Sequence, residues 1–503
     1  MVKLSEILSW MEMDLIGDDF DVVDLSLDSR KVEQGHAFIA LSGDSHHGID
    51  FAYQAQRAGA CVIFSEKKDN EKVKPKSRRQ PLRIDVYEIE NLSQRLGELS
   101  SKFYGNPAEK MKIVGITGTN GKTSSAWMLL QMWSQFGIKG GYIGTLGYGN
   151  LQQMHDQPNT TPSALDLHKI LAGFVSEGIT HVGLEVSSHG IHQGRVNTLD
   201  FDCVAFTNLS RDHLDFHKTI EEYAGVKKQL FTNYNSHCKV VNADDYYGSR
   251  WLIDFKNDSA SSKVFSFGLN NEESDVVASK VNLTAKGMDF NIGFNGENRE
   301  IHTSLLGLFN VENILLVATV LLGQRFDFEE ICNAIPQLQP VPGRMNCIIS
   351  HSETQSDPLI IVDYAHTPDA LEQVLKALKQ HNARKIWCVF GCGGNRDKGK
   401  RPQMGHIAEQ YADKVIITDD NPRFEDPEQI VQDILMGMET QPKVIHSRRD
   451  AIAHVIKNAD ADDLILIAGK GHEAYQIVNG QRFVFDDRSV AKQILLEHQE
   501  KCA

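Results

Sequence analysis

A glycine-rich loop between two patterned segments constrains this chain more than any other feature of its sequence. Ile113–Ile116 is an apolar run typical of a buried strand, Thr117-Gly-Thr-Asn-Gly-Lys-Thr123 follows it, and Ser124–Phe136 has the pattern of a helix. Glycine lets backbone N–H groups turn toward phosphate oxygens, and the N-terminus of a helix adds partial positive charge. The sequence therefore predicts a loop that binds the phosphates of a nucleotide.

The loop predicts ATP and Mg²⁺ as ligands. Lys122 is placed to reach the β- and γ-phosphates, and the Thr123 hydroxyl is placed to bind Mg²⁺. The loop is a shortened variant, since Ile116 stands where the common pattern has a glycine five residues before Gly121. A chance glycine turn is the alternative, but it would not require a strand and a helix on its two sides. The predicted ATP contacts are Gly118, Thr119, Asn120, Gly121, Lys122, Thr123 and Ser124.

The length of the chain predicts several domains. Its 503 residues are too many for one core of ordinary size and suggest about three domains. Asn106-Pro107 is one candidate boundary, because the residue before a proline disfavours helix, and Val341-Pro-Gly-Arg344 is another. We therefore expect domains at residues 1–106, 107–341 and 342–503.

The strand and helix patterns predict an α/β fold. The second and third domains alternate continuous apolar runs with helical stretches, as in parallel sheets that are covered on both faces. We expect a central P-loop ATPase-type parallel sheet, a C-terminal Rossmann-like doubly wound sheet and a smaller N-terminal α/β domain. Lys263–Ile301 alternates apolar and polar residues and is predicted to be a small antiparallel insert.

Charge and hydropathy exclude two classes of partner. The formal net charge of −15 disfavours a general nucleic-acid-binding protein, which is usually basic. No apolar run reaches the ~18 residues that suggest a membrane span, and Met1–Ile16 lacks the basic start of a signal peptide. We expect a cytoplasmic protein that neither binds nucleic acid nor inserts into a membrane.

Two residues near the ends of predicted strands are candidate ligands of Mg²⁺. Glu185 lies at the end of the run His181–Val186, and His213 lies just beyond the run Cys203–Phe206. The alternatives are an exposed acid at a strand end for Glu185 and a structural histidine for His213.

Lys227 lies on the apolar face of a predicted helix. It shares that face with Ile220, Tyr223, Leu230 and Phe231, whereas Lys228 points away from it. A lysine that faces inward near a phosphate site is costly unless it is paired or neutral. The alternative is a side chain that extends along the apolar surface to solvent.

The sequence resembles the Mur ligases of peptidoglycan synthesis over essentially its whole length. The motifs that carry the resemblance occur in the same order: Gly118-Thr-Asn-Gly-Lys-Thr123, Asn159-Thr-Thr161, Glu185-Val-Ser-Ser-His189, Thr207-Asn-Leu-Ser-Arg-Asp-His213, Gly307-x-Phe-Asn-x-x-Asn313, Asp363-Tyr-Ala-His-Thr-Pro368 and Gly391-Cys-Gly-Gly-Asn-Arg396. Asp420-Asn-Pro-Arg423 narrows the resemblance to members that add meso-diaminopimelate, since members that add L-lysine lack this arginine.

The resemblance implies a reaction. ATP would phosphorylate the D-glutamate carboxylate of UDP-N-acetylmuramoyl-L-alanyl-D-glutamate. An amine of meso-2,6-diaminopimelate would then attack the acyl phosphate and give an amide, ADP and phosphate. Mg²⁺ and Lys122 would spread the charge of the transferring phosphoryl group. The partners would be these small molecules, and we expect a monomer.

The resemblance also assigns catalytic residues. In the family, the lysine that matches Lys227 is carbamylated by CO₂ and helps to bind a second Mg²⁺. Lys122, Glu185, His213 and Lys227 would be catalytic, and the metal ligands would be Thr123, Glu185, His213 and carbamylated Lys227. Asn313 matches a contact of the adenine, while Arg344 and Asp363 match residues that meet ATP when the domains close.

Two further sets of residues match substrate contacts of the family. The UDP-sugar peptide would contact Leu27, Ser29, Asp44, Ser45, His46, Asn159, Thr160, Thr161, Ser187, Gln193 and Arg195. Diaminopimelate would contact Arg396, Asp420, Asn421, Pro422, Arg423, Gly469 and Glu473. A molecule with two carboxylates and two ammonium groups requires both guanidinium groups and acids.

Two other functions compete with this interpretation. A folylpolyglutamate synthetase has a similar phosphate loop and a similar acyl-phosphate route, but it lacks a comparable N-terminal domain and the Asp-Asn-Pro-Arg motif. A non-catalytic nucleotide-binding regulator could keep the fold, but the intact set of Lys122, Thr123, Glu185, Lys227 and His213 argues against it.

Overall fold

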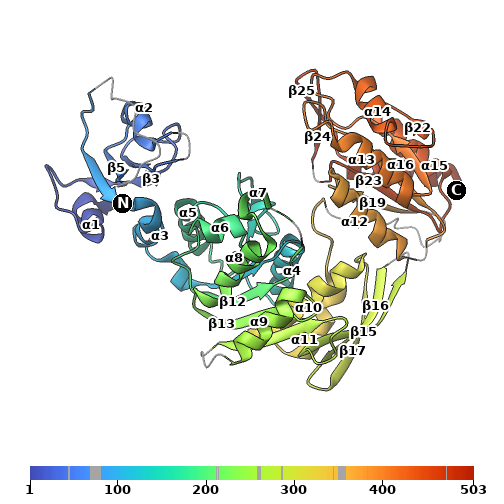
Figure 1. Ribbon diagram of the computed structural model, residues 1–503, viewed down its shortest axis with the longest axis horizontal. Helices are drawn as coiled ribbons and strands as arrows, with labels where there is room; N and C mark the ends of the chain where they lie inside the picture. Colours follow the sequence, from blue (N-terminus) through green and yellow to red (C-terminus); the bar gives the residue numbers. More distant parts are fainter. Residues whose placement is uncertain are drawn as a thin grey trace. The chain divides into compact units, whose positions relative to one another are not determined.

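The computed structural model describes residues 1–43, 46–67, 81–210, 212, 214–257, 262–284, 287–343, 345–348, 358–381, 383–471 and 473–502. The chain divides into two compact units, Met1–Phe265 and Ser266–Ala503, whose residues can be followed by colour in Figure 1. The division into domains at 1–106, 107–341 and 342–503 stays a prediction. In the part of the chain that is described, no helix has both the length and the apolar character that crossing a membrane requires.

The N-terminal part of the first unit is a small parallel sheet with helices on both faces. The strands lie in the order β3 (Asp24–Ser26), β4 (His36–Ala40), β5 (Val62–Lys67) and β6 (Val86–Glu90). Successive side chains of β4 point to opposite faces, so Ala37 and Ile39 pack with α1 (Leu4–Trp10) and α3 (Leu92–Phe103). Phe38 and Ala40 pack with α2 (Ala52–Ala58), and Figure 1 shows α1 and α2 on opposite sides of these strands. A short antiparallel pair, β1 (Val2–Lys3) and β2 (Asp21–Val22), precedes this sheet.

The rest of the first unit is built on a larger sheet. Its strands follow the order β10-β9-β8-β11-β7-β12-β13, with a parallel centre and antiparallel β9 and β10 at one end. The strands are β7 (Lys112–Thr117), β8 (Gly140–Gly144), β9 (Gly147–Gly149), β10 (Met154–His155), β11 (His181–Glu185), β12 (Phe201–Phe206) and β13 (Ser236–Asn242). The helices are α4 (Lys122–Gln135), α5 (Ala164–Ser176), α6 (Ser188–His192), α7 (Leu214–His217), α8 (Ile220–Thr232) and α9 (Tyr246–Asn257). Because β7, β11 and β12 are neighbours and parallel, the segments that follow them meet at one edge of the sheet.

The second unit begins with the predicted antiparallel insert. β15 (Val276–Thr284), β16 (Gly287–Phe294) and β17 (Glu297–Thr303) pair in antiparallel order, as the alternating sequence indicates. The end of β14 (Lys263–Gly268) pairs with β15 in parallel, so the first strand of the insert differs from the expected pattern. Two helices follow, α10 (Leu308–Gly323) and α11 (Phe328–Ala334).

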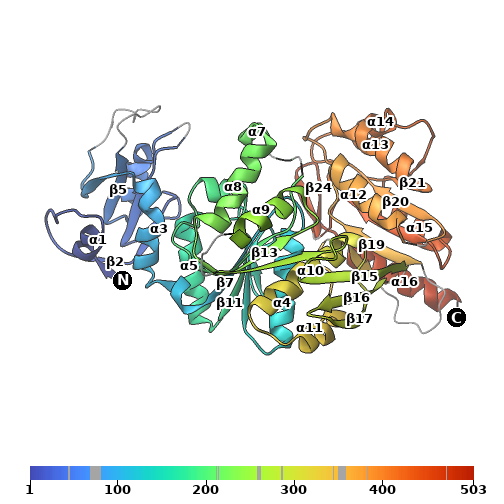
Figure 2. The same cartoon turned by 60° about the horizontal axis from the view of Figure 1, so that its bottom comes forward.

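The remainder of the second unit is a doubly wound sheet. Its order is β18-β19-β23-β20-β21-β22, and all pairs are parallel except that of β18 with β19. The strands are β18 (Asn346–Ile348), β19 (Leu359–Asp363), β20 (Ile386–Phe390), β21 (Lys414–Ile417), β22 (Lys443–Val444) and β23 (Leu464–Ala468). The helices are α12 (Pro368–Lys379), α13 (Lys400–Tyr411), α14 (Pro427–Leu435), α15 (Arg448–Asn458) and α16 (Asp487–Cys502). Figure 2 shows α13 and α14 on one side of this sheet and α15 and α16 on the other, so both faces are covered.

Candidate active site

The predicted phosphate loop lies between β7 and α4, at the carboxyl end of the parallel strands. Gly118 has a φ of +145°, and a Cβ at this position would lie 1.8 Å from Oγ1 of Thr207. Any other residue would be strained there and would collide with Thr207. The Nζ of Lys122 donates to the carbonyl oxygens of Gly118 at 2.9 Å and Thr119 at 2.8 Å. The ammonium group of Lys122 is therefore held by the loop itself.

The segment after β12 fixes the shape of the phosphate loop. The backbone oxygen of Asn208 accepts a hydrogen bond from the Thr119 N–H at 2.8 Å, and its Oδ1 accepts one from the Asn120 N–H at 3.0 Å. Oγ1 of Thr207 donates to the carbonyl oxygen of Asn120 at 2.6 Å. Two motifs that are about ninety residues apart in the sequence are thus one hydrogen-bonded structure.

Glu185 ends β11 and is fully buried, which excludes the alternative of an exposed acid at a strand end. Its carboxylate accepts hydrogen bonds from Oγ1 of Thr123 at 3.0 Å, from Oη of Tyr142, and from the Thr145 N–H and Oγ1 at 2.9 and 3.1 Å. The predicted Mg²⁺ ligands Thr123 and Glu185 therefore lie in direct contact. Sequence reasoning missed Tyr142 and Thr145, since the Gly144-Thr-Leu-Gly turn after an apolar run marks the end of a strand but not its contact with Glu185.

Lys227 is buried in α8 with 1% of its surface exposed, so its predicted inward orientation is confirmed. Its Nζ donates to the carbonyl oxygen of Gly118 at 2.8 Å and lies 4.5 Å from the ring centroid of Tyr223. Burial, and then the nearby charge of Lys122, hold the pKa of Lys227 well below its usual value, although Asp212 acts in the opposite direction. This environment favours the neutral amine, which is nucleophilic.

Several predicted contacts fall outside the described residues. They are Asp44, Ser45, His213 and Arg344. Among the residues that the structure describes, no group of three or more histidines, cysteines, aspartates and glutamates is arranged to hold a metal ion. The oxygens of Thr123 and Glu185 nevertheless have the chemistry that Mg²⁺ prefers, because Mg²⁺ binds hard oxygen ligands and keeps several waters or phosphate oxygens.

The predicted contacts of the sugar peptide in the larger sheet form one cluster next to Glu185. Oγ1 of Thr161 donates to the backbone oxygen of Glu185 and accepts from the Ser187 N–H, both at 2.9 Å. Arg195 donates from Nη1 to the Thr161 carbonyl at 2.5 Å and from Nη2 to Oε1 of Gln193 at 2.6 Å. Burial lowers the pKa of Arg195.

The neighbouring threonine of that motif links the cluster to the acid. Oγ1 of Thr160 lies 3.2 Å from Oγ1 of Thr145, which itself donates to Glu185. Asn159, the first residue of the motif, is exposed. The structure therefore joins the predicted metal ligand Glu185 with four of the predicted substrate contacts, and Thr160 is connected through Thr145.

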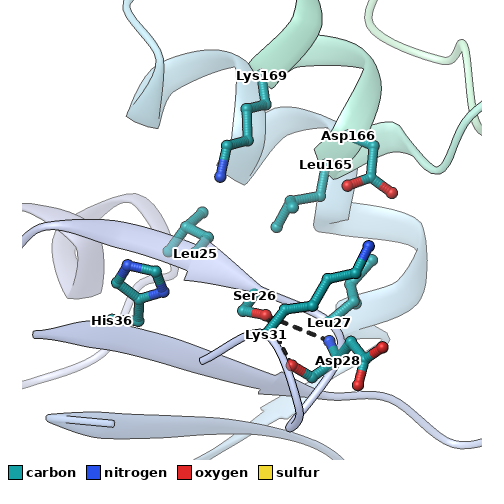
Figure 3. A pocket seen from close by; sticks show the side chains of 9 residues that line it. All are labelled: Leu25, Ser26, Leu27, Asp28, Lys31, His36, Leu165, Asp166 and Lys169. Atoms are coloured by element: carbon teal, nitrogen blue, oxygen red, sulfur yellow. Dashed lines mark hydrogen bonds between the residues drawn. The ribbon is translucent and has the colours of Figure 1, made fainter. Parts of the chain in front are cut away.

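The predicted contacts in the N-terminal sheet are more scattered. Leu27 lines a pocket between β3, β4 and α5, and Figure 3 shows Leu165 and Lys169 projecting from α5 toward the strands. The pocket holds about 110 Å³, whereas roughly 10–15 Å³ is enough for one water. Ser29 is not among the residues that line this pocket, and its Oγ donates to Oε1 of Gln54 at 3.1 Å. His46 is exposed. The other lining residues are Leu25, Ser26, Asp28, Lys31, His36 and Asp166.

Two predicted ATP contacts lie in the second unit. Asn313 is buried on α10, and its Nδ2 donates to Oδ1 of Asn310 at 3.1 Å. Asp363 ends β19 and accepts hydrogen bonds from the N–H groups of Met345 and Ala365, each at 2.7 Å. Asp363 therefore fixes the backbone at the start of the doubly wound sheet.

The predicted contacts of diaminopimelate gather after β20, β21 and β23, at the carboxyl ends of three adjacent strands. Asp420 and Asn421 are buried, and Nδ2 of Asn421 donates to Oε2 of Glu473 at 3.0 Å. A Cβ on Gly469 would lie 2.8 Å from Oδ2 of Asp420, so this carboxylate packs against bare backbone. Pro422 is also buried, next to Asn421.

The two predicted arginines lie beside this cluster. Arg423 has a φ of +54°, which is unusual for a residue with a side chain. Its N–H donates to the Ile477 carbonyl at 3.0 Å, and its Nη1 donates to the Gly394 carbonyl at 2.8 Å. Arg396 is exposed, and its Cγ lies 3.8 Å from the place where a Cβ on Gly393 would be. Arg423 is thus held in a strained conformation, as is common at functional sites.

Over 480 residues the chain is 42% identical to a protein of Xylella fastidiosa (strain 9a5c) named UDP-N-acetylmuramoyl-L-alanyl-D-glutamate–2,6-diaminopimelate ligase, an alignment that covers 95% of this chain and 94% of that protein. The chain belongs to the Mur ligase family. Three family models match it in order: Mur ligase family, catalytic domain at residues 22–104; Mur ligase middle domain at 116–321; and Mur ligase, glutamate ligase domain at 343–471.

Solved structures agree with this membership. A structure of a UDP-N-acetylmuramoyl-L-alanyl-D-glutamate–2,6-diaminopimelate ligase is 35% identical, has a TM-score of 0.73 and covers 99% of both chains. A folylpolyglutamate synthase of Mycobacterium tuberculosis is 17% identical, has a TM-score of 0.58 and covers 75% of this chain and 92% of that one, which shows a shared fold alone. The predicted α/β fold and the prediction of an ATP-dependent, amide-forming ligase are confirmed, and Mur ligases use ATP and Mg²⁺.

Proposed function

We propose that this Mur ligase joins meso-2,6-diaminopimelate to the D-glutamate of UDP-N-acetylmuramoyl-L-alanyl-D-glutamate. The observation that carries the proposal is the cluster of Asp420, Asn421, Arg423 and Glu473 at the carboxyl ends of adjacent strands. Relatives of that name over nearly the whole chain support it. The reaction belongs to peptidoglycan synthesis, and roles in cell shape and cell division would follow from it.

The phosphate loop would activate the D-glutamate carboxylate. Its carboxylate oxygen attacks the γ-phosphorus of ATP, the bond to the β,γ-bridging oxygen breaks, and ADP leaves. Lys122 supplies positive charge beside the loop, and the N–H groups at the start of α4 supply more. Mg²⁺ bound by Thr123 and Glu185 would neutralise phosphate charge.

Lys227 would become a carbamate. Its neutral Nζ attacks the carbon of CO₂ and loses a proton, which leaves a carboxylate at the end of the side chain. The support for this step is the burial of Lys227 and its low pKa beside Lys122. The product would add oxygen ligands for a second Mg²⁺ near Gly118, whose carbonyl oxygen the Lys227 Nζ contacts.

The cluster in the second unit would hold the amine. Diaminopimelate carries two carboxylates and two ammonium groups, so a guanidinium fork and acids are needed together. Arg423 donates from Nη1 to the Gly394 carbonyl, and among the described residues the Nε and Nη2 groups of its guanidinium donate to no protein acceptor. Those groups would bind a substrate carboxylate, while Glu473 and Asp420 would attract an ammonium group. A neutral amine of the substrate then attacks the acyl phosphate carbon, and inorganic phosphate leaves.

An amino-acid-dependent assay tests this proposal. Phosphate release from ATP is measured with the UDP-linked dipeptide and with meso-diaminopimelate, L-lysine or L-glutamate as the amine. We expect release with meso-diaminopimelate and much less with the other two. Release with L-lysine alone would contradict the assignment of the amine, and release with a folate and L-glutamate would favour a folylpolyglutamate synthetase. No release with any combination would favour a non-catalytic nucleotide-binding regulator.

Two finer properties belong to the same proposal. We infer a cytoplasmic location, since ATP and nucleotide-linked sugars are the substrates. We also infer a monomer, which sedimentation of the purified protein tests by comparing its mass with the 56.3 kDa of one chain.

A further inference from the structure

Lys470 lies in a Gly-Lys-Gly turn directly after β23, next to the cluster of Asp420, Asn421 and Glu473. The two glycines of the turn, Gly469 and Gly471, have φ values of +116° and +51°. A Cβ on Gly471 would lie 2.6 Å from the carbonyl oxygen of Gly343, so this turn needs glycine for space as well as for conformation. The turn directs the intervening lysine inward, and Lys470 is 0% exposed.

The buried ammonium group of Lys470 contacts two of the predicted diaminopimelate residues. Its Nζ lies 3.4 Å from Oδ1 of Asn421 and 3.4 Å from Oε2 of Glu473. It also lies 5.5 Å from the ring centroid of Tyr475. A fully buried ammonium group is costly unless it is paired, so these contacts are the reason that it is tolerated.

The same contacts determine how Asn421 is oriented. Its Oδ1 accepts a hydrogen bond from the Ile477 N–H at 2.9 Å and faces the Lys470 ammonium, while its Nδ2 donates to Glu473 at 3.0 Å. A reversed amide would place an NH₂ group against two donors and an oxygen against a carboxylate. Lys470 and the Ile477 backbone therefore select one of the two amide orientations.

We propose that Lys470 is a positioning residue for the amino-acid substrate. Its ammonium group holds the Asn421 amide and the Glu473 carboxylate in the arrangement that receives an ammonium group of a diamino acid. Because Lys470 is 0% exposed, it acts through these two side chains and does not contact the substrate. This inference rests on the proposed function and adds to it a residue that the family motifs did not point to.

The test compares Lys470→Met with Lys470→Arg in steady-state kinetics. Methionine keeps an unbranched stem of similar length beside Tyr475 and removes the charge. We expect Lys470→Met to raise the KM for meso-diaminopimelate about tenfold or more, because a charge-assisted contact within an ordered network is lost. The KM values for ATP and the UDP-linked dipeptide should stay within about twofold, because the substitution removes no contact assigned to these substrates. A tenfold change in either KM would require a loss of ~1.4 kcal/mol of binding free energy. Lys470→Arg keeps the charge and should restore part of the affinity.

Two controls separate positioning from general damage. Val455→Ala removes a buried methyl pair from α15 in the same unit and should lower the melting temperature without changing any KM. Lys443→Gln removes an exposed lysine from the same sheet and should change neither quantity. An unchanged KM for meso-diaminopimelate in Lys470→Met overturns the inference, as does an equal rise in Val455→Ala. If the wild-type protein itself shows no turnover that depends on meso-diaminopimelate, the proposed function fails instead.

A double variant covers the case in which Lys470→Met does not fold. Glu473→Gln removes the charge that Lys470 neutralises, so Lys470→Met/Glu473→Gln buries no unpaired charge. If Lys470 acts by holding Glu473, the KM of the double variant should lie within about threefold of Glu473→Gln alone, since coupled residues are not additive. A further tenfold rise would show that Lys470 does not act through Glu473 and would overturn that part of the inference, leaving only its contact with Asn421.

Discussion

At the scale of single residues, burial determines the chemistry of Lys227. An exposed lysine is protonated at neutral pH and does not react with CO₂, whereas a buried lysine beside a second ammonium group favours its neutral form. Lys227 meets both conditions, with 1% of its surface exposed and Lys122 nearby. Its neighbour Lys228 has a different environment, because it pairs with Asp254 at 2.6 Å.

Lys227→Ala should abolish most of the ligase activity. We expect a loss of at least ~100-fold, which is the usual cost of removing one group that stabilises charge in the transition state. Short carboxylic acids such as formate or acetate should restore part of the activity, because they supply the missing carboxylate. Phosphate release is the measurement, and Lys228→Ala is the matched control, which should keep near-normal activity. Full activity of Lys227→Ala without added acid would rule out the carbamate.

Arg423→Ala should weaken the binding of meso-diaminopimelate selectively. A charge-assisted fork contributes ~1.5–3 kcal/mol, so the KM for the amino acid should rise by more than about tenfold. Arg423→Lys should give an intermediate value, since it keeps the charge and loses the planar fork. The control is Arg449→Ala, which removes a half-exposed arginine of α15. A wild-type KM in Arg423→Ala would remove this residue from the site.

The orientation of Lys227 could be predicted from the sequence, whereas the partners of Glu185 could not. The inward orientation of Lys227 follows from helical spacing, which is a local property, and the structure confirms it. The partners of Glu185 were not predictable in the same way, because Tyr142 and Thr145 lie some forty residues earlier and meet it only through the pairing of β8 with β11. Long-range contacts of this kind leave no periodic pattern.

At the scale of elements, a buried ion pair joins α15 and α16 to the sheet of the second unit. Arg448 donates from Nε and Nη2 to the two carboxylate oxygens of Asp487, each at 2.7 Å. Nη2 also donates to the carbonyl oxygen of Ala468 at the end of β23, at 2.9 Å. The nearby charge of Asp487 and the hydrogen bonds to it help to raise the pKa of Arg448 despite its burial. The strands and helices of this unit were predictable from their apolar periods, but this pairing was not, because it links residues 39 positions apart.

Asp487→Ala should destabilise the second unit strongly. It leaves the Arg448 guanidinium buried and unpaired, a change that costs ~3–5 kcal/mol in comparable cases. Urea unfolding measures the effect. Replacing both residues, as in Arg448→Met/Asp487→Leu, should cost much less, because no unpaired charge remains buried. If Asp487→Ala lowers the free energy of unfolding by less than about 1 kcal/mol, water reaches the Arg448 guanidinium, because a solvent-exposed ion pair contributes no more than about 1 kcal/mol.

At the scale of the whole molecule, the chain consists of two compact units, Met1–Phe265 and Ser266–Ala503. The order of the folded segments, their sheet types and the antiparallel insert were predictable, since each depends on local patterns and on short connections. The division into units was not, because compactness depends on contacts between distant residues. Contacts divide the chain between Phe265 and Ser266, and the expected domain boundaries near residues 106 and 341 stay a prediction.

Thermal unfolding should therefore not follow a single two-state transition. Chains with more than one unit commonly deviate from two-state behaviour. We expect the calorimetric enthalpy to exceed the van't Hoff enthalpy, and we expect Asp487→Ala to shift only the component that belongs to residues 266–503. A single transition with equal enthalpies that moves as a whole in Asp487→Ala would show that the two units unfold together.

The conformation of Gly118 and its close approach to Thr207 limit which substitutions position 118 can tolerate. Any other residue at position 118 has two problems. Its Cβ would lie 1.8 Å from Oγ1 of Thr207, and its backbone would be strained at a φ of +145°. A second mutation at position 207 removes the first problem and leaves the second, because the torsion belongs to position 118 itself. A variant at Gly118 is therefore not restored by a change at position 207, and reversion to glycine is the expected route to recovery.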